Sequence, residues 1–436
     1  MRKSSLFILV FFLLFLSTLA VLVWASNQYD GWSKVKVTSF FVPDPAAPVA
    51  FHSGDWGIPA AEELPALPEY LQHSLEYLAE AQAPDGGWGA GLHSRQNISD
   101  PHAVATDPAT TALVAMALLR TGSNLTAGPY RSNLGNATEY LLSVTENADD
   151  QALNITEQRA TQPQSKLGEN VDVALAAQYF ARLTPHLGDA GHIYQRVMSA
   201  LDRCVAMLEA AQLDDGSWSN RGWAPVLNSS MSNNALELAQ RVGRPVNPEV
   251  LHRSRTYQRQ NVYADGGVRT KSAAGVPLYA LSSTQRATAS AANTTRQALA
   301  NEMEQTQDTL SKALAIEALE KQGYDADDAE TMAADYVTNV AAARQVLTDE
   351  VQVGFGNNGG EEFLSHMLTS ESLAALGGEN WTNWYQRMNE LYSNIQNGNA
   401  SWSGHHCITS PVFCTAAVVM AMTADREPRA LMAVNG

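Results

Sequence analysis

The stretch YLAEAQAPDGGWGAG, residues 77–91, joins the end of an amphipathic helix to a glycine-rich turn and a tryptophan. Similar stretches follow at MLEAAQLDDGSWSN, residues 207–220, and QNGNASW, residues 396–402. A weaker copy without the tryptophan spans residues 260–268. Each copy is followed by a loop and a second helical pattern. The recurrence of one turn at several places predicts an architecture of repeated helical hairpins.

The residues of the repeated turn have distinct expected roles. Proline, aspartate and glycine reverse the chain, because glycine adopts positive φ and aspartate hydrogen-bonds its own backbone. The indole is expected to cover the apolar underside of the turn, and the glutamine amide to bond neighbouring backbone groups. We interpret the motif as structural. Its members are Gln82, Asp85, Trp88, Gln212, Asp215, Trp218, Gln396 and Trp402.

Two kinds of helical segment alternate between these turns. One kind is amphipathic, with Leu71, Leu75 and Leu78 on one face. The other kind is apolar nearly all round, as in residues 109–119, 171–180 and 414–422. A helix that is apolar on every side must be buried on every side. An inner ring of apolar helices enclosed by amphipathic ones meets both conditions, so we expect an all-α fold, an α/α toroid.

The turn motifs resemble the repeat of the squalene cyclases, the protein prenyltransferase β subunits and the complement-type thioester domains. Three further stretches resemble exported proteins that carry prenyltransferase/squalene-cyclase repeats; they are residues 166–183, 359–373 and 401–417. The resemblance covers residues 67–426 and implies the toroid fold of the terpenoid cyclase/protein prenyltransferase superfamily. These motifs are specific for the fold and much less so for chemistry.

The N-terminus has the features of an export signal. Arg2 and Lys3 precede an apolar run over residues 6–24, and a spanning helix needs about 17–25 such residues. We expect residues 1–25 to form a signal anchor or transmembrane helix. The positive charges would stay cytoplasmic, so the chain would be a single-pass protein of the cell membrane with its C-terminal domain extracytoplasmic. Cleavage near Trp24 would instead release a secreted protein.

The remaining chain divides by composition. Residues 26–64 are proline-rich and predict a linker. Residues 65–428 predict the toroid domain, with a helical insertion at about 284–350, where the sequence is rich in Ala, Gln and Thr. Residues 429–436 would be a tail. The net charge of −17 excludes nucleic acid as a partner. The expected partners are the membrane, through the N-terminal helix, and a protein or an apolar small ligand.

Residues 325–328 read Asp-Ala-Asp-Asp, which resembles the acid motif of class II terpene cyclases. Such an acid must be kept protonated in an apolar cavity. Here the neighbours are polar and the motif opens a helix, where carboxylates are favoured by the helix dipole. We expect Asp325 to cap that helix.

The candidate chemistry lies where the last two inner helices begin. The candidate catalytic residues are Glu361, Glu362, His405 and His406. In protein prenyltransferases the last repeat supplies a zinc-binding histidine, and the resemblance places Cys414 in that slot. Glu362, His406 and Cys414 would then be three zinc ligands with a fourth position open. A disulfide between Cys407 and Cys414 is the alternative outside the cytoplasm, and it excludes thiolate ligation.

Parallel inner helices would gather their N-termini at one end of the ring. Polar groups there would converge over an apolar funnel, which is the usual setting of a ligand site. Besides the residues above, this end would collect His102, Thr106, Asp107, Glu169, Asp172, Asn233 and Asn234.

Three functions stay open at this point. The first is a membrane-tethered toroid that binds a partner or an apolar ligand in or over its central cavity. The second is a metal-dependent enzyme that acts on an isoprenoid or lipid-like substrate at the mouth of the ring. The third is an α/α-barrel polysaccharide lyase or hydrolase.

Overall fold

The structure is a computed structural model that describes residues 56, 58, 64–187, 191–219, 221–263, 267–303, 311–354, 356 and 358–432. The predicted anchor at residues 1–25 and nearly all of the predicted linker at 26–64 lie outside the described residues. Among the helices that are described, none combines the length and the hydropathy needed to cross a bilayer.

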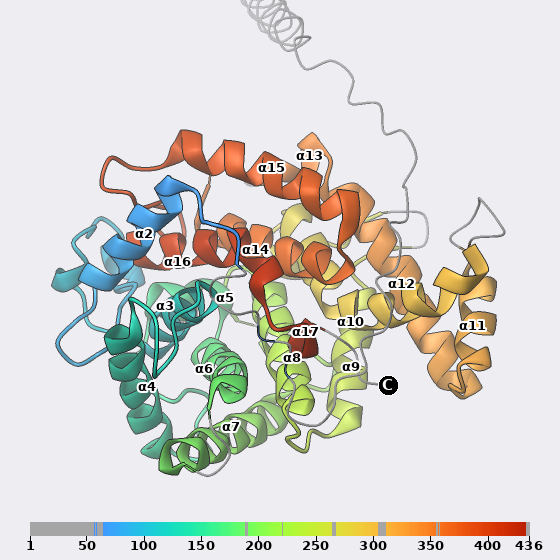
Figure 1. Cartoon of the computed structure of the whole chain (residues 1–436), viewed down its shortest axis with the longest axis horizontal. Helices are drawn as coiled ribbons and strands as arrows, with labels where there is room; N and C mark the ends of the chain where they lie inside the picture. Colours follow the sequence, from blue (N-terminus) through green and yellow to red (C-terminus); the bar gives the residue numbers. More distant parts are fainter. Residues whose placement is uncertain are drawn as a thin grey trace, which may run out of the picture. The chain divides into compact units, whose positions relative to one another are not determined.

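Six helices form a closed inner ring, in which each helix contacts the next and the last contacts the first (Figure 1). They are α3 (Pro108–Arg120), α6 (Val171–Leu183), α8 (Pro225–Arg241), α10 (Pro277–Met303), α14 (Gly360–Leu376) and α16 (Pro411–Met422). Every residue of α3, α6 and α16 is buried. The wholly apolar segments therefore line the inside of the ring, as predicted.

An outer layer of amphipathic helices surrounds the ring, and each outer helix precedes an inner one. The outer helices are α2 (Glu69–Glu80), α4 (Arg131–Glu146), α7 (His192–Ala211), α9 (Pro248–Arg259), α12 (Ala326–Val346) and α15 (Gly378–Ile395). On α2, Leu71, Leu75 and Leu78 are buried. Two short helices, α5 (Gln162–Leu167) and α13 (Asp349–Gln352), lie in the connections. The described chain is an all-α toroid, as predicted.

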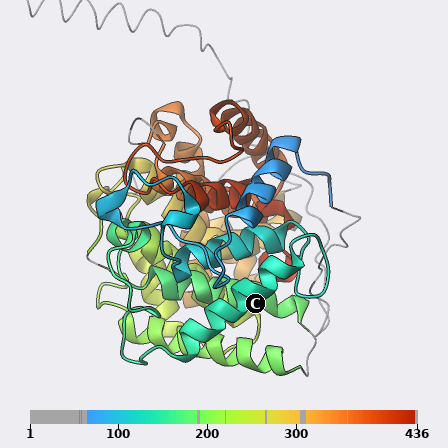
Figure 2. The ribbon, with the colours of Figure 1, turned by 90° about the vertical axis from the view of Figure 1, so that its left-hand side faces the viewer.

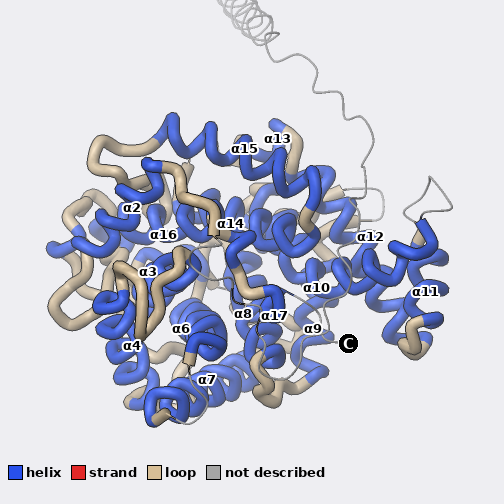
Figure 3. Tube along the Cα trace, in the orientation of Figure 1, coloured by secondary structure: helices blue, strands red, loops and turns tan. Residues whose placement is uncertain are grey.

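The first and last hairpins close the circle. Helix α2 packs on α16, and the Tyr70 hydroxyl donates to the Asn389 side chain of α15 at 2.9 Å. Figures 1 and 2 both show the blue α2 beside the red helices of the C-terminal hairpin. Within the described ranges, strand pairing is limited to two isolated bridges, so Figure 3 shows helices and loops alone.

The repeated turn has one geometry in its three tryptophan-containing copies. The indole N–H of Trp88, Trp218 and Trp402 donates to the carbonyl ten residues earlier, at 2.7, 2.7 and 3.0 Å. The glutamine amide donates to a carbonyl of its own turn and to a carbonyl of a neighbouring outer helix, α4, α9 or α2. Asp85 and Asp215 accept from the backbone N–H two residues later. This is the geometry that a structural role requires.

The stretch expected to be an insertion, 284–350, instead supplies parts of the ring itself. It contains most of the inner helix α10 and all of the outer helix α12, which pack along each other. The part that projects is α11 (Lys312–Lys321) with the adjoining ends of α10 and α12, seen at the right of Figure 1. The polar composition of α10 concealed a buried helix. Asp325 caps α12, as expected, by accepting from the Asp328 backbone N–H at 2.9 Å.

Candidate functional site at the mouth of the ring

We call the mouth the end of the ring at which the inner helices begin, formed around residues 358–362 and 403–410. Two glycines allow these segments to approach closely. The Gly360 N–H donates to the Ile408 carbonyl at 2.9 Å. A Cβ at Gly359 would lie 2.7 Å from the His406 ring, and one at Gly360 would lie 2.6 Å from the Ile408 side chain. The Gly-Gly-Glu-Glu sequence thus places residues 405–408 directly on the N-terminus of α14.

Three side chains converge at this contact. Glu361, His406 and Cys407 each offer one ligand atom, and the three atoms lie within 4.8 Å of one another. Glu361 is buried, whereas His406 and Cys407 are partly exposed. Carboxylate oxygen, imidazole nitrogen and thiolate sulfur are all ligands of Zn²⁺. We call these three residues the Glu-His-Cys cluster.

Burial and the adjacent Glu362 carboxylate raise the pKa of Glu361 to about 7. One of its oxygens accepts from the Ile408 backbone N–H at 3.4 Å. The other is buried and meets no hydrogen-bond geometry among the described residues, although the carboxyl interacts with the Cys407 thiol. A cation beside this carboxylate would stabilise the charged form.

Burial, with the nearby Glu361, also raises the pKa of Cys407 to about 12, although Lys166 acts in the opposite direction. A nucleophilic cysteine has a lowered pKa, so the surroundings of Cys407 do not activate it for attack. A bound metal ion would reverse this effect, because coordination deprotonates a thiol. The electrostatics of the cluster therefore favour a cation over a free nucleophile.

The cluster shares only His406 with the predicted ligand set of Glu362, His406 and Cys414. Glu362 accepts from the Gly359 N–H at 2.8 Å and from the Tyr279 hydroxyl at 2.5 Å, so it caps α14. The Cys414 thiol is buried in the first turn of α16 and donates to the Ile408 carbonyl at 3.6 Å. Adjacent residues of a helix point about 100° apart. The Glu361 side chain therefore points into the cluster, whereas that of Glu362 does not.

Cys407 and Cys414 are both free thiols in the structure, and the alternative disulfide between them stays a prediction. Cys204 is a free thiol buried in the core. The His405 side chain is exposed, and its backbone N–H donates to the Asn358 carbonyl at 2.7 Å. His405 is absent from the cluster.

Side chains from neighbouring segments hydrogen-bond to the backbone at and beside the cluster. The Gln162 side-chain oxygen accepts from the Thr409 and Ser410 backbone N–H groups at 2.6 and 3.2 Å. The Gln96 amide donates to the Cys407 carbonyl. These contacts and Lys166 were missed from the sequence, because they join segments more than 240 residues apart.

Of the other polar residues expected at the mouth, some cap helices or bond the turns there, and others lie inside the ring. Asp107 caps α3 by accepting from the Thr110 backbone N–H at 2.8 Å, and Thr106 donates to Asp85 of the turn at 2.7 Å. Asn233 and Asn234 do not lie at the mouth, because α8 begins at Pro225 and places them more than two turns into the ring.

The interior of the ring is polar, so the expected apolar funnel is wrong. The Asn234 amide donates to Gln178 at 3.1 Å and to Glu371 at 3.3 Å. Arg286 of α10 donates to both Asn234 and Glu371. These side chains come from four inner helices and cross the ring. An apolar ligand would have to displace a charged, hydrogen-bonded network, which is costly.

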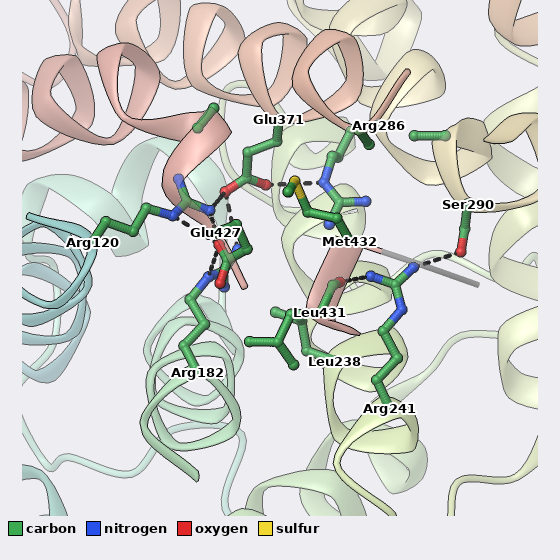
Figure 4. A pocket seen from close by; sticks show the side chains of 13 residues that line it. Arg120, Arg182, Leu238, Arg241, Arg286, Ser290, Glu371, Glu427, Leu431 and Met432 are labelled. Atoms are coloured by element: carbon green, nitrogen blue, oxygen red, sulfur yellow. Dashed lines mark hydrogen bonds and ion pairs between the residues drawn. The ribbon is translucent and has the colours of Figure 1, made fainter. Parts of the chain in front are cut away.

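The opposite end of the ring, where the inner helices finish, carries arginines (Figure 4). Arg120 and Arg182 lie in the last turns of α3 and α6, where the helix dipole favours a cation. Glu371 accepts from both, at 2.6 and 3.0 Å. Glu427, beyond the ring, accepts from Arg120 Nε at 2.7 Å and from Arg182 Nε at 2.9 Å. Burial alone would raise the pKa of Glu371 and Glu427, but the arginines hold both below their usual range.

The arginine end was not predicted from the sequence. A signal was present, because Arg120 and Arg182 each sit at the end of a helix with no exposed face. A cation in such a position must find a buried partner.

No family model and no curated protein sequence matches the chain. Similar solved structures include a type II terpene cyclase from Scytonema in complex with merosterolic acid A, at 15% identity over 82% of this chain and 96% of that one, with a TM-score of 0.44. An alpha-1,6-mannanase of Salegentibacter sp. HEL1_6 in complex with alpha-1,6-mannotriose is 11% identical over 85% and 99% of the two chains, with a TM-score of 0.48. These structures resemble this chain in the arrangement of their helices. Their sequence identities are too low to indicate a shared activity.

Proposed function

We propose that the chain is a metal-dependent enzyme that holds a Zn²⁺ ion at the mouth of its toroid. The observation that carries the proposal is the convergence of Glu361, His406 and Cys407 ligand atoms within 4.8 Å. The buried oxygen of Glu361 that meets no hydrogen-bond geometry among the described residues supports it, as do the raised pKa values of Glu361 and Cys407. Each is the expected state of a ligand set in the absence of its cation.

Three protein ligands would leave a fourth position of a tetrahedral ion open, so that it could act as a Lewis acid on an ester, amide or phosphoryl group. The chain supplies further supporting groups. Glu362 lies 3.8 Å from His406 Nε2 and is itself fixed by Tyr279. Such an outer carboxylate orients a ligating imidazole. Lys166 lies beside Cys407 and could neutralise an anionic substrate group.

The substrate would lie over the mouth, because polar side chains fill the ring behind it. Three loops at this end expose large apolar side chains. Leu92, Leu153 and Trp223 are 36%, 42% and 44% exposed. Apolar groups around a polar centre favour an amphipathic, lipid-like substrate.

We place this centre outside the cytoplasm, with the toroid tethered to the cell membrane by the N-terminal segment. The support is the apolar run over residues 6–24 after Arg2 and Lys3. Metal coordination would also protect the Cys407 thiol from oxidation in that compartment.

The test is the metal content of the full-length protein purified without added chelator. We expect about one zinc per chain. Cys407→Ser should reduce the zinc content at least tenfold, as should Glu361→Gln. Cys414→Ala is the matched control, since it removes a nearby thiol outside the cluster and should keep the metal. Equal zinc loss in the Cys407 and Cys414 variants, or no zinc in the wild type, would refute the proposal.

A non-catalytic toroid that binds a partner at the same apolar loops is the second candidate. The exposed Leu92, Leu153 and Trp223 favour it. A protein without zinc, with three titratable thiols after denaturation, would support this candidate over the enzyme.

A further inference from the structure

A C-terminal segment covers the arginine end of the ring. We define it as residues 424–432, comprising a single turn at Ala424–Arg426 and α17 (Arg429–Met432). Figure 1 shows α17 in front of the inner helices, and the turn contacts α14 while α17 contacts α8. Leu431 is buried there. The predicted tail is therefore docked on the ring as far as Met432.

The side chains beneath this segment carry more positive than negative charge. Four arginines line the cavity shown in Figure 4, and they are Arg120, Arg182, Arg241 and Arg286. Two carboxylates, Glu371 and Glu427, line it as well. Four positive and two negative charges leave a balance of +2. A third carboxylate, Glu237, forms ion pairs with Arg286 and with a further arginine, Arg255. It also attracts Arg241. Counting Glu237 and Arg255 together leaves the balance unchanged.

Arg241 has no carboxylate partner within 4.0 Å in the described part of the chain. It donates instead to the Ser290 hydroxyl at 2.6 Å and to the Leu431 carbonyl of the C-terminal segment. Burial lowers the pKa of Arg241 to about 10. Arg241 is half-buried, and the carboxylates of Glu237 and Glu427 attract it without forming an ion pair within 4.0 Å. A guanidinium whose hydrogen-bond partners are all neutral can accept a bound anion.

Two small cavities remain between the C-terminal segment and this end of the ring. Glu427 lines both cavities, one of about 20 Å³ beside Arg241 and Arg286 and one of about 30 Å³ beside His186. Each has room for about one or two water molecules. Removing the Glu427 side chain would join the space on its two sides.

We propose that the arginine end is a binding site for a multivalent oxyanion of the phosphate or pyrophosphate class, and that Glu427 occupies it as an internal ligand. The guanidinium fork matches carboxylate and phosphate oxygens equally well. Arg120 and Arg182 already present their Nε atoms to one oxygen of Glu427. An anion with more charge and more oxygens than a carboxylate would also satisfy Arg241.

If Glu427 only held the C-terminal segment on the ring, we would expect a different arrangement of charges. It would pair each buried arginine with a carboxylate, because unpaired buried charge costs stability. The excess of two cations and the neutral partners of Arg241 point to a ligand instead. The site is independent of the Glu-His-Cys cluster at the mouth, so either proposal can fail alone.

The test is calorimetric titration of the full-length protein with inorganic pyrophosphate, before and after removal of metal by chelation. Chelation removes any binding to a metal at the mouth and should leave binding at the arginine end. We expect Glu427→Gln to bind pyrophosphate at least tenfold more tightly than wild type, because the internal competitor loses its charge. Adding Arg241→Gln to that variant should weaken binding at least tenfold.

Arg196→Gln is the matched control, since Arg196 pairs with Glu139 and Glu146 on the outer surface. It should leave pyrophosphate binding unchanged. A sodium chloride titration at equal ionic strength accounts for screening. Absence of pyrophosphate binding in the folded wild type and in Glu427→Gln, or equal losses with Arg196→Gln and Arg241→Gln, would overturn the proposal.

Hydrogen exchange on the wild type covers the case in which Glu427→Gln does not fold. Pyrophosphate that displaces Glu427 should increase amide exchange in residues 424–432 while the inner helices stay protected. Unchanged or slower exchange in this segment at saturating pyrophosphate would contradict an internal ligand.

Discussion

The two ends of the ring contain the same kinds of charged group in opposite arrangements. At the mouth, Glu361 and Cys407 are crowded, and their pKa values are raised in the direction of the neutral forms. At the other end, Glu371 lies among three arginines that hold its pKa low. Glu361 and Glu371 are ten residues apart on one helix, α14. The surroundings therefore disfavour the charged form of the carboxyl at the mouth and favour it at the arginine end.

The largest expected effect comes from substituting these two glutamates in turn. Glu371→Gln removes a carboxylate shared by three buried arginines and leaves Glu427 to pair with two of them. It should destabilise the protein by about 3–5 kcal/mol. Glu361→Gln in the metal-free protein at pH 8 should leave stability unchanged or raise it, since it removes a penalised charge. Urea unfolding of both variants measures the difference. Equal destabilisation would remove the contrast between the two ends.

The next largest effect is expected in the pH dependence of stability, to which the two ends of the ring should contribute differently. The folded state holds a proton on Glu361 up to about pH 7, whereas the unfolded state releases it near pH 4.5. The folded state therefore binds more protons in this window, and metal-free stability falls as pH rises through it. The expected loss is on the order of 2–4 kcal/mol.

Glu371 makes the opposite contribution to the pH dependence of stability. Its folded pKa is lowered, so its stabilisation is present above about pH 4.5 and is lost as the pH falls further. Urea unfolding between pH 3 and pH 8 checks both limbs. Burial also raises the pKa of Asp172 to about 7, so Glu361→Gln should reduce the neutral limb without abolishing it and leave the acid limb intact. An unchanged neutral limb in that variant would contradict the account of the mouth.

The turns at the mouth should respond alike because their geometry repeats. Trp88→Phe, Trp218→Phe and Trp402→Phe each keep an aromatic ring and lose one buried hydrogen bond, at an expected cost of about 1–2 kcal/mol. Thermal or urea unfolding of the three variants measures the costs. A turn that tolerates the change without loss would not depend on the hydrogen bond between the indole and its own outer helix.

The smallest expected effect is that of Asp325→Ala, which removes a cap from a helix remote from both ends. It should cost about 1 kcal/mol and leave zinc content and pyrophosphate binding at wild-type values. Loss of either would assign the Asp-Ala-Asp-Asp motif a chemical role that its geometry does not indicate.

The fold could be predicted because its signals are local. The Gln–Trp turns and the wholly apolar helices around Leu113 and Val418 constrain the chain wherever they occur. The position of the mouth could also be predicted, because parallel inner helices must all begin at the same end of the ring. The ligand set did not, because a choice between Glu361 and Glu362 depends on the angle at which α14 starts. That angle is set by the packing of Gly360 against Ile408, 48 residues later in the chain.

The arginine end could not be assembled from the sequence, because its partners are distant. Arg120 meets Glu371 and Glu427, which are 251 and 307 residues away. Helix α10 was misjudged for a related reason. Its Ser, Thr and Gln residues are typical of a surface, yet they are buried against the polar sides of α8 and α14.

X-ray absorption spectroscopy at the zinc edge, on full-length protein purified without chelator, tests the central claim most directly. The account predicts one zinc per chain with a single sulfur ligand at about 2.3 Å and nitrogen and oxygen ligands at about 2.0–2.1 Å. The sulfur contribution should be absent from Cys407→Ser reconstituted with excess zinc and should persist in Cys414→Ala. Zinc without a sulfur ligand, or a sulfur signal that depends on Cys414, would contradict the account.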